Sequence, residues 1–152
     1  METEGQILQF ISLQESAKQQ DLLTLHELMT SIFPTGKLWM EDGKNEEGKV
    51  VTNPTIGYGE FEQSYANGKR KTHFQIGLAL TKQGFSFYLL GIRGKLDLAN
   101  LCAEIGQAKV TGYCIQFKSI ANIDINILKR AIQFALNISG TKTKTDDTLA
   151  NP

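Results

Sequence analysis

The sequence predicts an α+β fold, in which a twisted, mainly antiparallel sheet has helices packed on one face. Two helical patterns come first, a hairpin signal at Asn67-Gly68 follows among alternating residues, and helix, strand and helix patterns come last. The opposite face of the sheet is then expected to stay partly open to solvent or to a partner.

The N-terminal region is predicted to form two helices and a short strand. Residues 7–13 contain closely spaced apolar side chains, and residues 16–33 repeat such side chains at the spacing of an amphipathic helix. Pro34 ends this second helix. Residues 37–40 are predicted to form a strand, and the polar segment 41–49 an exposed loop. The apolar stripe of the second helix consists of Leu22, Leu25, Met29 and Ile32.

The Asn67-Gly68 dipeptide is predicted to form a two-residue hairpin turn, because both turn positions need positive φ angles that these residues tolerate. The resulting cross-strand pairs would be Glu62 with His73, Phe61 with Phe74, and Tyr58 with Gly77. One face would pack on helices and carry Phe61, Tyr65, Phe74, Ile76, Leu78 and Leu80. The other face would be polar and carry Tyr58, Glu60, Glu62, Ser64, Lys71, His73 and Gln75.

The C-terminal region is predicted to alternate strands and helices. Residues 85–90 are apolar on both sides, which is typical of a central strand, and residues 113–118 alternate as a further strand. Asp97 and Asp124 each precede an apolar helical pattern, as N-cap residues do. The stripe of the final helix consists of Ile127, Leu128, Ala131, Ile132 and Ala135.

Length and charge restrict the class of protein. The 152 residues fit one domain at residues 1–140, followed by a polar tail at residues 141–152 that is expected to be disordered. The chain has 16 basic and 16 acidic residues, whereas proteins that neutralise phosphates carry a basic excess, so no nucleic-acid partner is expected. No apolar run reaches the roughly 20 residues that cross a bilayer, so no membrane partner is expected.

The two cysteines, Cys102 and Cys114, and the lack of a secretory pattern at the N-terminus indicate a cytoplasmic protein with reduced thiols. Cys114 could act as a nucleophile beside a histidine or cation that lowers its pKa, but no local motif supplies one. We therefore expect no enzyme and no cofactor. The antiparallel sheet edges are compatible with a monomer or a homodimer.

Glu60, Glu62 and His73 form a possible metal site in the predicted hairpin. The pairing would place His73 opposite Glu62 with Glu60 on the same face, and such a set suits iron or zinc. The favoured interpretation is an exposed cross-strand charge pair, which contributes about 0.2–1 kcal/mol.

The aromatic residues near the hairpin are possible ligand-binding residues. Gly57 and Gly59 lack side chains and would let a bulky ring or another backbone approach the strand closely. The rings could instead complete the core, which is the interpretation we favour. The possible pocket residues are Trp39, Tyr58, Tyr65 and Tyr88, with Lys82 near the rim.

Three segments carry a family resemblance: GYGEFEQSYANGKRK, LTKQGFSFYLL and GQAKVTGYCIQFKSIANIDINIL. They resemble the YdhG-like family of small bacterial proteins, a domain of unknown function, and the resemblance covers residues 7–138. The matching positions are a Trp before the hairpin, a Gly-aromatic-Gly strand, an aromatic residue before a small-residue turn, a Lys before the next strand and an Asp that begins a helix. These residues are Trp39, Gly57, Tyr58, Gly59, Tyr65, Gly68, Lys82 and Asp124.

Some members of this wider family are described as frataxin-like iron chaperones, so the resemblance implies a distantly frataxin-like fold. As an alternative function it implies iron binding, for which Glu60, Glu62 and His73 would be the ligands. The leading hypothesis is an intracellular, non-enzymatic binding or adaptor domain that uses the open sheet face and its aromatic residues. Its partner, an unknown protein or small molecule, is not specified by the sequence.

Overall fold

The structure, a computed structural model, describes residues 2–92 and 96–149, and describes side chains as far as residue 138. The helices are α1 (Thr3–Ser12), α2 (Ser16–Ile32), α3 (Leu98–Leu101), the short 3₁₀ helix η1 (Ile120–Asn122) and α4 (Ile125–Leu149). The strands are β1 (Leu38–Glu41), β2 (Thr55–Tyr58), β3 (Phe61–Ser64), β4 (Arg70–His73), β5 (Ile76–Thr81), β6 (Gly84–Leu89), β7 (Lys109–Val110) and β8 (Cys114–Phe117).

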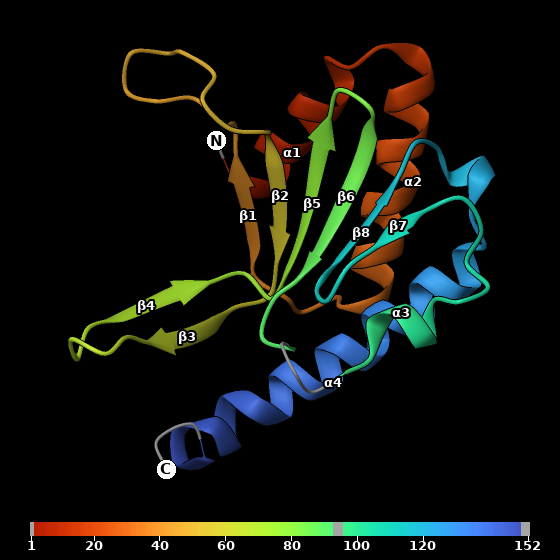
Figure 1. Cartoon of the computed structure of the whole chain (residues 1–152). Coiled ribbons are helices and arrows are strands. Elements are labelled where there is room, and N and C mark those ends of the chain that lie inside the picture. The colour runs from red at the N-terminus through yellow and green to blue at the C-terminus, as the bar shows by residue number, and fades with distance from the viewer. Residues whose placement is uncertain (1, 93–95, 150–152) are drawn as a thin grey trace.

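Six of the strands form one sheet in the order β1-β2-β5-β6-β8-β7, with every pair antiparallel (Figure 1). β3 and β4 form a separate two-stranded sheet that projects away from the larger one. β6 lies between β5 and β8, and apart from the half-buried Tyr88 its residues are buried. The apolar pattern at residues 85–90 therefore did identify an inner strand.

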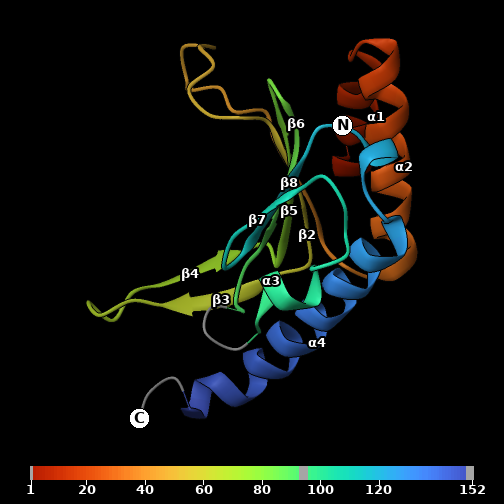
Figure 2. The same cartoon turned by 45° about the vertical axis from the view of Figure 1, so that its right-hand side comes forward.

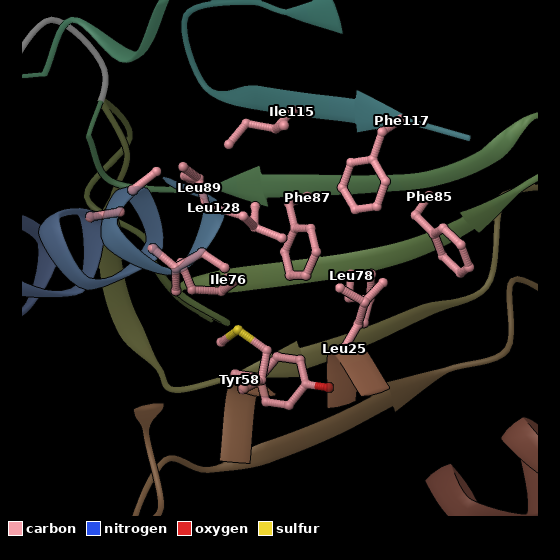
Figure 3. Packing of buried hydrophobic residues seen from close by; sticks show 14 of the residues in the cluster. Leu25, Tyr58, Ile76, Leu78, Phe85, Phe87, Leu89, Ile115, Phe117 and Leu128 are labelled. Atoms are coloured by element: carbon pink, nitrogen blue, oxygen red, sulfur yellow. The ribbon is translucent and has the colours of Figure 1, made fainter. Parts of the chain in front are cut away.

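Helices α1, α2 and α4 cover one face of the six-stranded sheet (Figure 2). In the part of the chain that the structure describes, no helix covers the opposite face, which we call the open face. The core lies between the sheet and the helices, where rings and aliphatic side chains interlock (Figure 3). Fully burying each large apolar side chain there stabilises the fold by about 1.5–3 kcal/mol. The predicted α+β architecture, with helices on one face, is confirmed.

The prediction of a two-residue turn at the hairpin is wrong, because the observed loop has three residues. The amide of Gly68 donates to the Tyr65 carbonyl, and the amide of Tyr65 donates to the Lys69 carbonyl, so three residues form the loop. Gly68 has a φ of 83°, whereas Asn67 does not have a positive φ. This geometry is typical of a type I turn followed by a glycine bulge, and it needs one positive φ instead of two.

The longer loop shifts the pairing along the whole hairpin. Phe61 lies opposite His73, and Tyr58 lies opposite Ile76. Because side chains alternate between the faces of a strand, this shift exchanges the predicted inner and outer positions on one side of the hairpin. Tyr58, predicted on the polar face, is 1% exposed and belongs to the core.

The remaining predicted elements are close to those observed. The side chains of Asp97 and Asp124 accept hydrogen bonds from the backbone at the starts of α3 and α4, as predicted. α3 is short and ends at Leu101. α4 runs to Leu149 and so includes most of the segment expected to be a polar tail, of which residues 150–152 lie outside the described part.

Among the residues that the structure describes, no helix combines the length and the apolar character needed to span a bilayer.

Candidate functional site

The centre of the open face is a row of residues that crosses the sheet from β1 to β8. Trp39 pairs with Gly57, Gly57 with Gly77, Gly77 with Tyr88, and Tyr88 with Cys114. Residues paired directly across antiparallel strands share a face, so these five positions form one row. In this row two adjacent glycines lie between the rings of Trp39 and Tyr88, and they leave space above the backbone.

The ring of Phe74 fills that space. A Cβ atom placed on Gly57 or on Gly77 would lie 2.5 or 2.6 Å from atoms of the Phe74 ring, so the ring packs directly on the two backbones. Trp39 meets Phe74 edge to face, with ring centroids 6.1 Å apart. Together with Tyr88 and Tyr113 these rings form what we call the aromatic row.

Hydrogen bonding and charge hold Trp39 in this position. Its Nε1 donates to the Gly59 carbonyl over 2.7 Å, which fixes the plane of the indole. The Nζ atom of Lys37 lies 4.4 Å from the centre of the Trp39 ring, a favourable cation–π arrangement. The Trp39 side chain is half-buried, so part of it remains available for contact.

Tyr88 and Tyr113 continue the aromatic row toward β8. Their ring centroids lie 6.2 Å apart and their planes are inclined by 32°. Tyr88 is half-buried, and Tyr113 is 39% exposed. Both residues therefore present aromatic surface on the face that no described helix covers.

A hollow of about 570 Å³ adjoins Tyr88 on the open face. Its volume falls within the range of small-molecule sites. Its walls come from the end of β5, from β6 and β8, and from the segment that contains β7. The residues that line it are Asn53, Thr81, Gln83, Phe85, Ser86, Tyr88, Gln107, Ala108, Lys109, Gln116, Phe117 and Lys118.

Cys114 lies beside this hollow but is not a poised nucleophile. It shares the face of Tyr88, as the strand alternation predicts, yet its side chain is buried. Burial raises the pKa of the Cys114 thiol, although hydrogen bonds from Gln116 and Ser86 and the charge of Lys109 act in the opposite direction. The thiol therefore stays protonated at neutral pH.

The structure separates the predicted pocket residues. Trp39 and Tyr88 lie on the open face, and Lys82 is exposed in the turn between β5 and β6, beside two residues that line the hollow. Tyr58 lies on the opposite face and is buried. Tyr65 lies at the end of the projecting hairpin and is 41% exposed.

Tyr58 belongs to a chain of polar side chains that links three elements and is buried at Tyr58 and His26. Its hydroxyl and the Nδ1 atom of His26 share a hydrogen bond of 2.6 Å, and the Nε2 atom of His26 lies 3.4 Å from Glu4. Burial, and secondarily the charge of Glu4, strongly raises the pKa of Tyr58. This chain fixes α1 and α2 to β2, and it is closed to solvent at the Tyr58 end.

The predicted metal ligands do not converge. The correct register places His73 opposite Phe61, so Glu62 and His73 point to opposite faces of the two-stranded sheet. Glu62 accepts a hydrogen bond of 2.7 Å from Arg70, and Glu60 pairs with Lys37. Among the described residues, no three His, Cys, Asp or Glu side chains are grouped closely enough to hold a metal ion.

Sequence reasoning missed Phe74, Tyr113 and the two lysines of the hollow. Phe74 was expected in the core because it stands two residues before Ile76, but β4 ends at His73 and β5 begins at Ile76, so the strand alternation is interrupted there and the Phe74 ring lies on the open face. Gly57 and Gly77 were the available signal, because two glycines paired across strands indicate a ring lying on the sheet. Lys109, on β7, and Lys118, directly after β8, were not identified as neighbours, because the pairing of these two strands depends on tertiary contacts.

Comparisons with models of protein families, with curated proteins and with solved structures gave no match for this chain.

Proposed function

We propose that this protein is a non-enzymatic binding domain whose ligand site is the open face of the sheet. The observation that carries the proposal is the aromatic row. This row crosses the open face of the sheet, and each of its side chains keeps part of its surface accessible to solvent. A site of this kind supplies a large contact area at a low cost in side-chain entropy, because aromatic rings have few rotatable bonds.

The composition of the hollow supports ligand binding. It combines an aromatic wall with amide, hydroxyl and ammonium groups, which is the usual make-up of a site that orients a small ligand. A second hollow of about 410 Å³ lies between α2 and α4, where Ile32 and Phe134 line it. We favour the open face, because the aromatic row is continuous with the hollow there through Tyr88.

The arrangement of titratable groups supports a role without catalysis. The Cys114 thiol has a raised pKa, and no histidine lies in the hollow lining. His26 lies on the helix side in contact with Tyr58, and His73 lies on the projecting hairpin. A nucleophile needs a base within hydrogen-bond reach, and the described residues around Cys114 do not provide one.

We also propose that the chain is a YdhG-like domain that works inside the cell. The family proposal rests on the matching segments around Trp39, Tyr58 and Asp124. The location rests on Cys102 and Cys114, which are both free thiols buried in the fold, as expected in a reducing compartment. We do not extend the proposal to iron, because Glu60, Glu62 and His73 lie apart and have other contacts.

The proposal is tested by screening a few hundred small, chemically diverse fragments against the isotopically labelled full chain by NMR. We expect fragments to shift amide signals of residues 86–88, 107–110 and 114–118. The variant Tyr88→Ala should lose these responses, and Phe134→Ala, a matched truncation of an exposed ring on α4, should keep them.

Either of two results would reject the proposal. If fragments bind elsewhere, for instance between α2 and α4, or if Tyr88→Ala binds them as well as the unmodified protein does, the open face is not the site. Spectra of both variants must show the native fold for the comparison to count.

A further inference from the structure

Building on the proposed function, we infer that the hollow beside Tyr88 binds a small organic anion. The negatively charged group of that ligand lies between Lys109 and Lys118, and its flat apolar part packs against Tyr88. The inference rests on the charge, the hydrogen-bonding groups and the size of the hollow.

The charge of the hollow is one-sided. Lys109 and Lys118 both line it, and of the described residues in its lining none is Asp or Glu. The ion pairs among the described side chains involve His26, Lys37 and Arg70, so no described carboxylate neutralises either lysine. On a chain whose net charge is zero, two unneutralised cations in one hollow favour an anionic ligand.

The strand register places the polar groups together. Lys109 pairs with Gln116, and Gln116 pairs with Ser86, so these three side chains share the open face. Lys118 directly follows β8 and lines the hollow together with Gln116 and Lys109. The Ser86 hydroxyl is buried and bonded to Cys114, so the donors offered to a ligand are the Gln116 amide and the two ammonium groups. Together these can donate several hydrogen bonds to the oxygens of a carboxylate or phosphate.

The size and the walls of the hollow favour a small molecule over a macromolecular segment. Its volume of about 570 Å³ matches one compact ligand. The turn at Gln83 and the segment at Gln107 form part of its lining. The basic tip of the hairpin differs, because its residues line neither of the two hollows described above and its Arg70 is already paired with Glu62.

The inference is tested with four probes that separate ring from charge: phenyl phosphate, inorganic phosphate, benzyl alcohol and benzylammonium. Each is titrated into the labelled full chain at constant ionic strength. We expect phenyl phosphate to bind at the hollow at least about tenfold more tightly than benzyl alcohol, because of its charge-assisted hydrogen bonds. Benzylammonium should not bind there.

Two double variants that remove the same charge test whether Lys109 and Lys118 bind the anion. Lys109→Gln combined with Lys118→Gln should weaken phenyl phosphate binding about tenfold or more. Lys69→Gln combined with Lys71→Gln removes the same charge from the exposed hairpin tip and should leave the affinity within about twofold. Tyr88→Ala should weaken phenyl phosphate binding more than inorganic phosphate binding, because it removes the ring contact alone.

The outcomes separate this inference from the proposed function. If benzyl alcohol or benzylammonium binds the hollow as tightly as phenyl phosphate, the open face is a ligand site but the anion inference is wrong. The same holds if the hairpin-tip variant weakens phenyl phosphate binding as much as the hollow variant. If no probe and no screening fragment shifts the open face, both proposals are wrong.

Discussion

The hydroxyl of Tyr58 contributes to stability through a hydrogen bond that is removed from water. Tyr58 and His26 are 1% and 2% exposed, and their bond joins β2 to α2. A buried polar atom that loses its partner cannot turn to solvent, so the loss costs more than the net value of an exposed hydrogen bond. Tyr65 and His73 form a comparable pair, 3.1 Å apart, at the surface of the hairpin.

We predict that Tyr58→Phe lowers the free energy of unfolding by about 1–3 kcal/mol, because it leaves the Nδ1 atom of His26 buried without its partner. Tyr65→Phe removes the same atom from a tyrosine–histidine pair but should cost less than about 0.5 kcal/mol, because water replaces the hydroxyl. Urea unfolding followed by circular dichroism measures both values. Equal costs for the two variants would contradict this account of the buried bond.

The close packing of the Phe74 ring on strands β2 and β5 explains why glycines are paired across these two strands. Gly57 and Gly77 do not have positive φ angles, so space, and not backbone conformation, requires glycine at these positions. The ring covers the backbone of both strands and positions the edge of Trp39. The glycine pair thus shapes the middle of the aromatic row.

We predict that Gly57→Ala and Gly77→Ala each destabilise the protein by about 1–3 kcal/mol, because the new methyl group overlaps the Phe74 ring. This overlap outweighs the smaller gain from a stiffer unfolded chain. Gly112→Ala is the control, since nothing lies within 4 Å of its Cβ position, and it should change stability by less than about 0.5 kcal/mol.

A double-mutant cycle tests whether the overlap with the Phe74 ring causes this loss of stability. Combined with Phe74→Ala, the Gly77→Ala change should cost clearly less than it does alone, because the ring that it meets is gone. If the two costs simply add, the methyl group is not in conflict with Phe74, and the packing explanation is wrong. Thermal and urea unfolding of the four proteins supply the necessary values.

The two buried thiols make the stability of the whole molecule depend on pH. Burial raises the pKa values of Cys102 and Cys114 above their ordinary value of 9.0. Well below pH 9 the thiols are protonated in both states, so stability does not change with pH through them. As the pH rises further, the unfolded chain releases these protons first, so the unfolded state is favoured and stability falls.

We predict that the free energy of unfolding decreases between pH 8 and pH 10 more steeply in the unmodified protein than in the variant with Cys102→Ala and Cys114→Ala. Each proton that separates the two states contributes about 1.4 kcal/mol per pH unit. Urea titrations at fixed ionic strength measure the slope. Parallel slopes for the two proteins would show that thiol ionisation is not coupled to folding.

Residue patterns alone predicted the main helices in order, the N-caps at Asp97 and Asp124, the inner position of β6 and the α+β class with helices on one face. They did not predict β7 or the division of the hairpin into four short strands. These features depend on local periodicity and on side chains that bond to the nearby backbone, both of which are visible in a single chain. The candidate site was predicted in part, as Trp39 and Tyr88 show.

Only the tertiary structure decided the hairpin register, because Asn67-Gly68 fits both a two-residue turn and a three-residue loop with a glycine bulge. The burial of Ile56 and Tyr58 against Ile76 and Leu78 favours the second. This one-residue difference in strand register placed Tyr58 in the core and put Glu62 and His73 on opposite faces of the hairpin. The break between β4 and β5, which no local pattern predicted, placed Phe74 on the open face. The hollow at Lys109 and Lys118 likewise depends on strand pairing between distant segments, which local residue patterns do not specify.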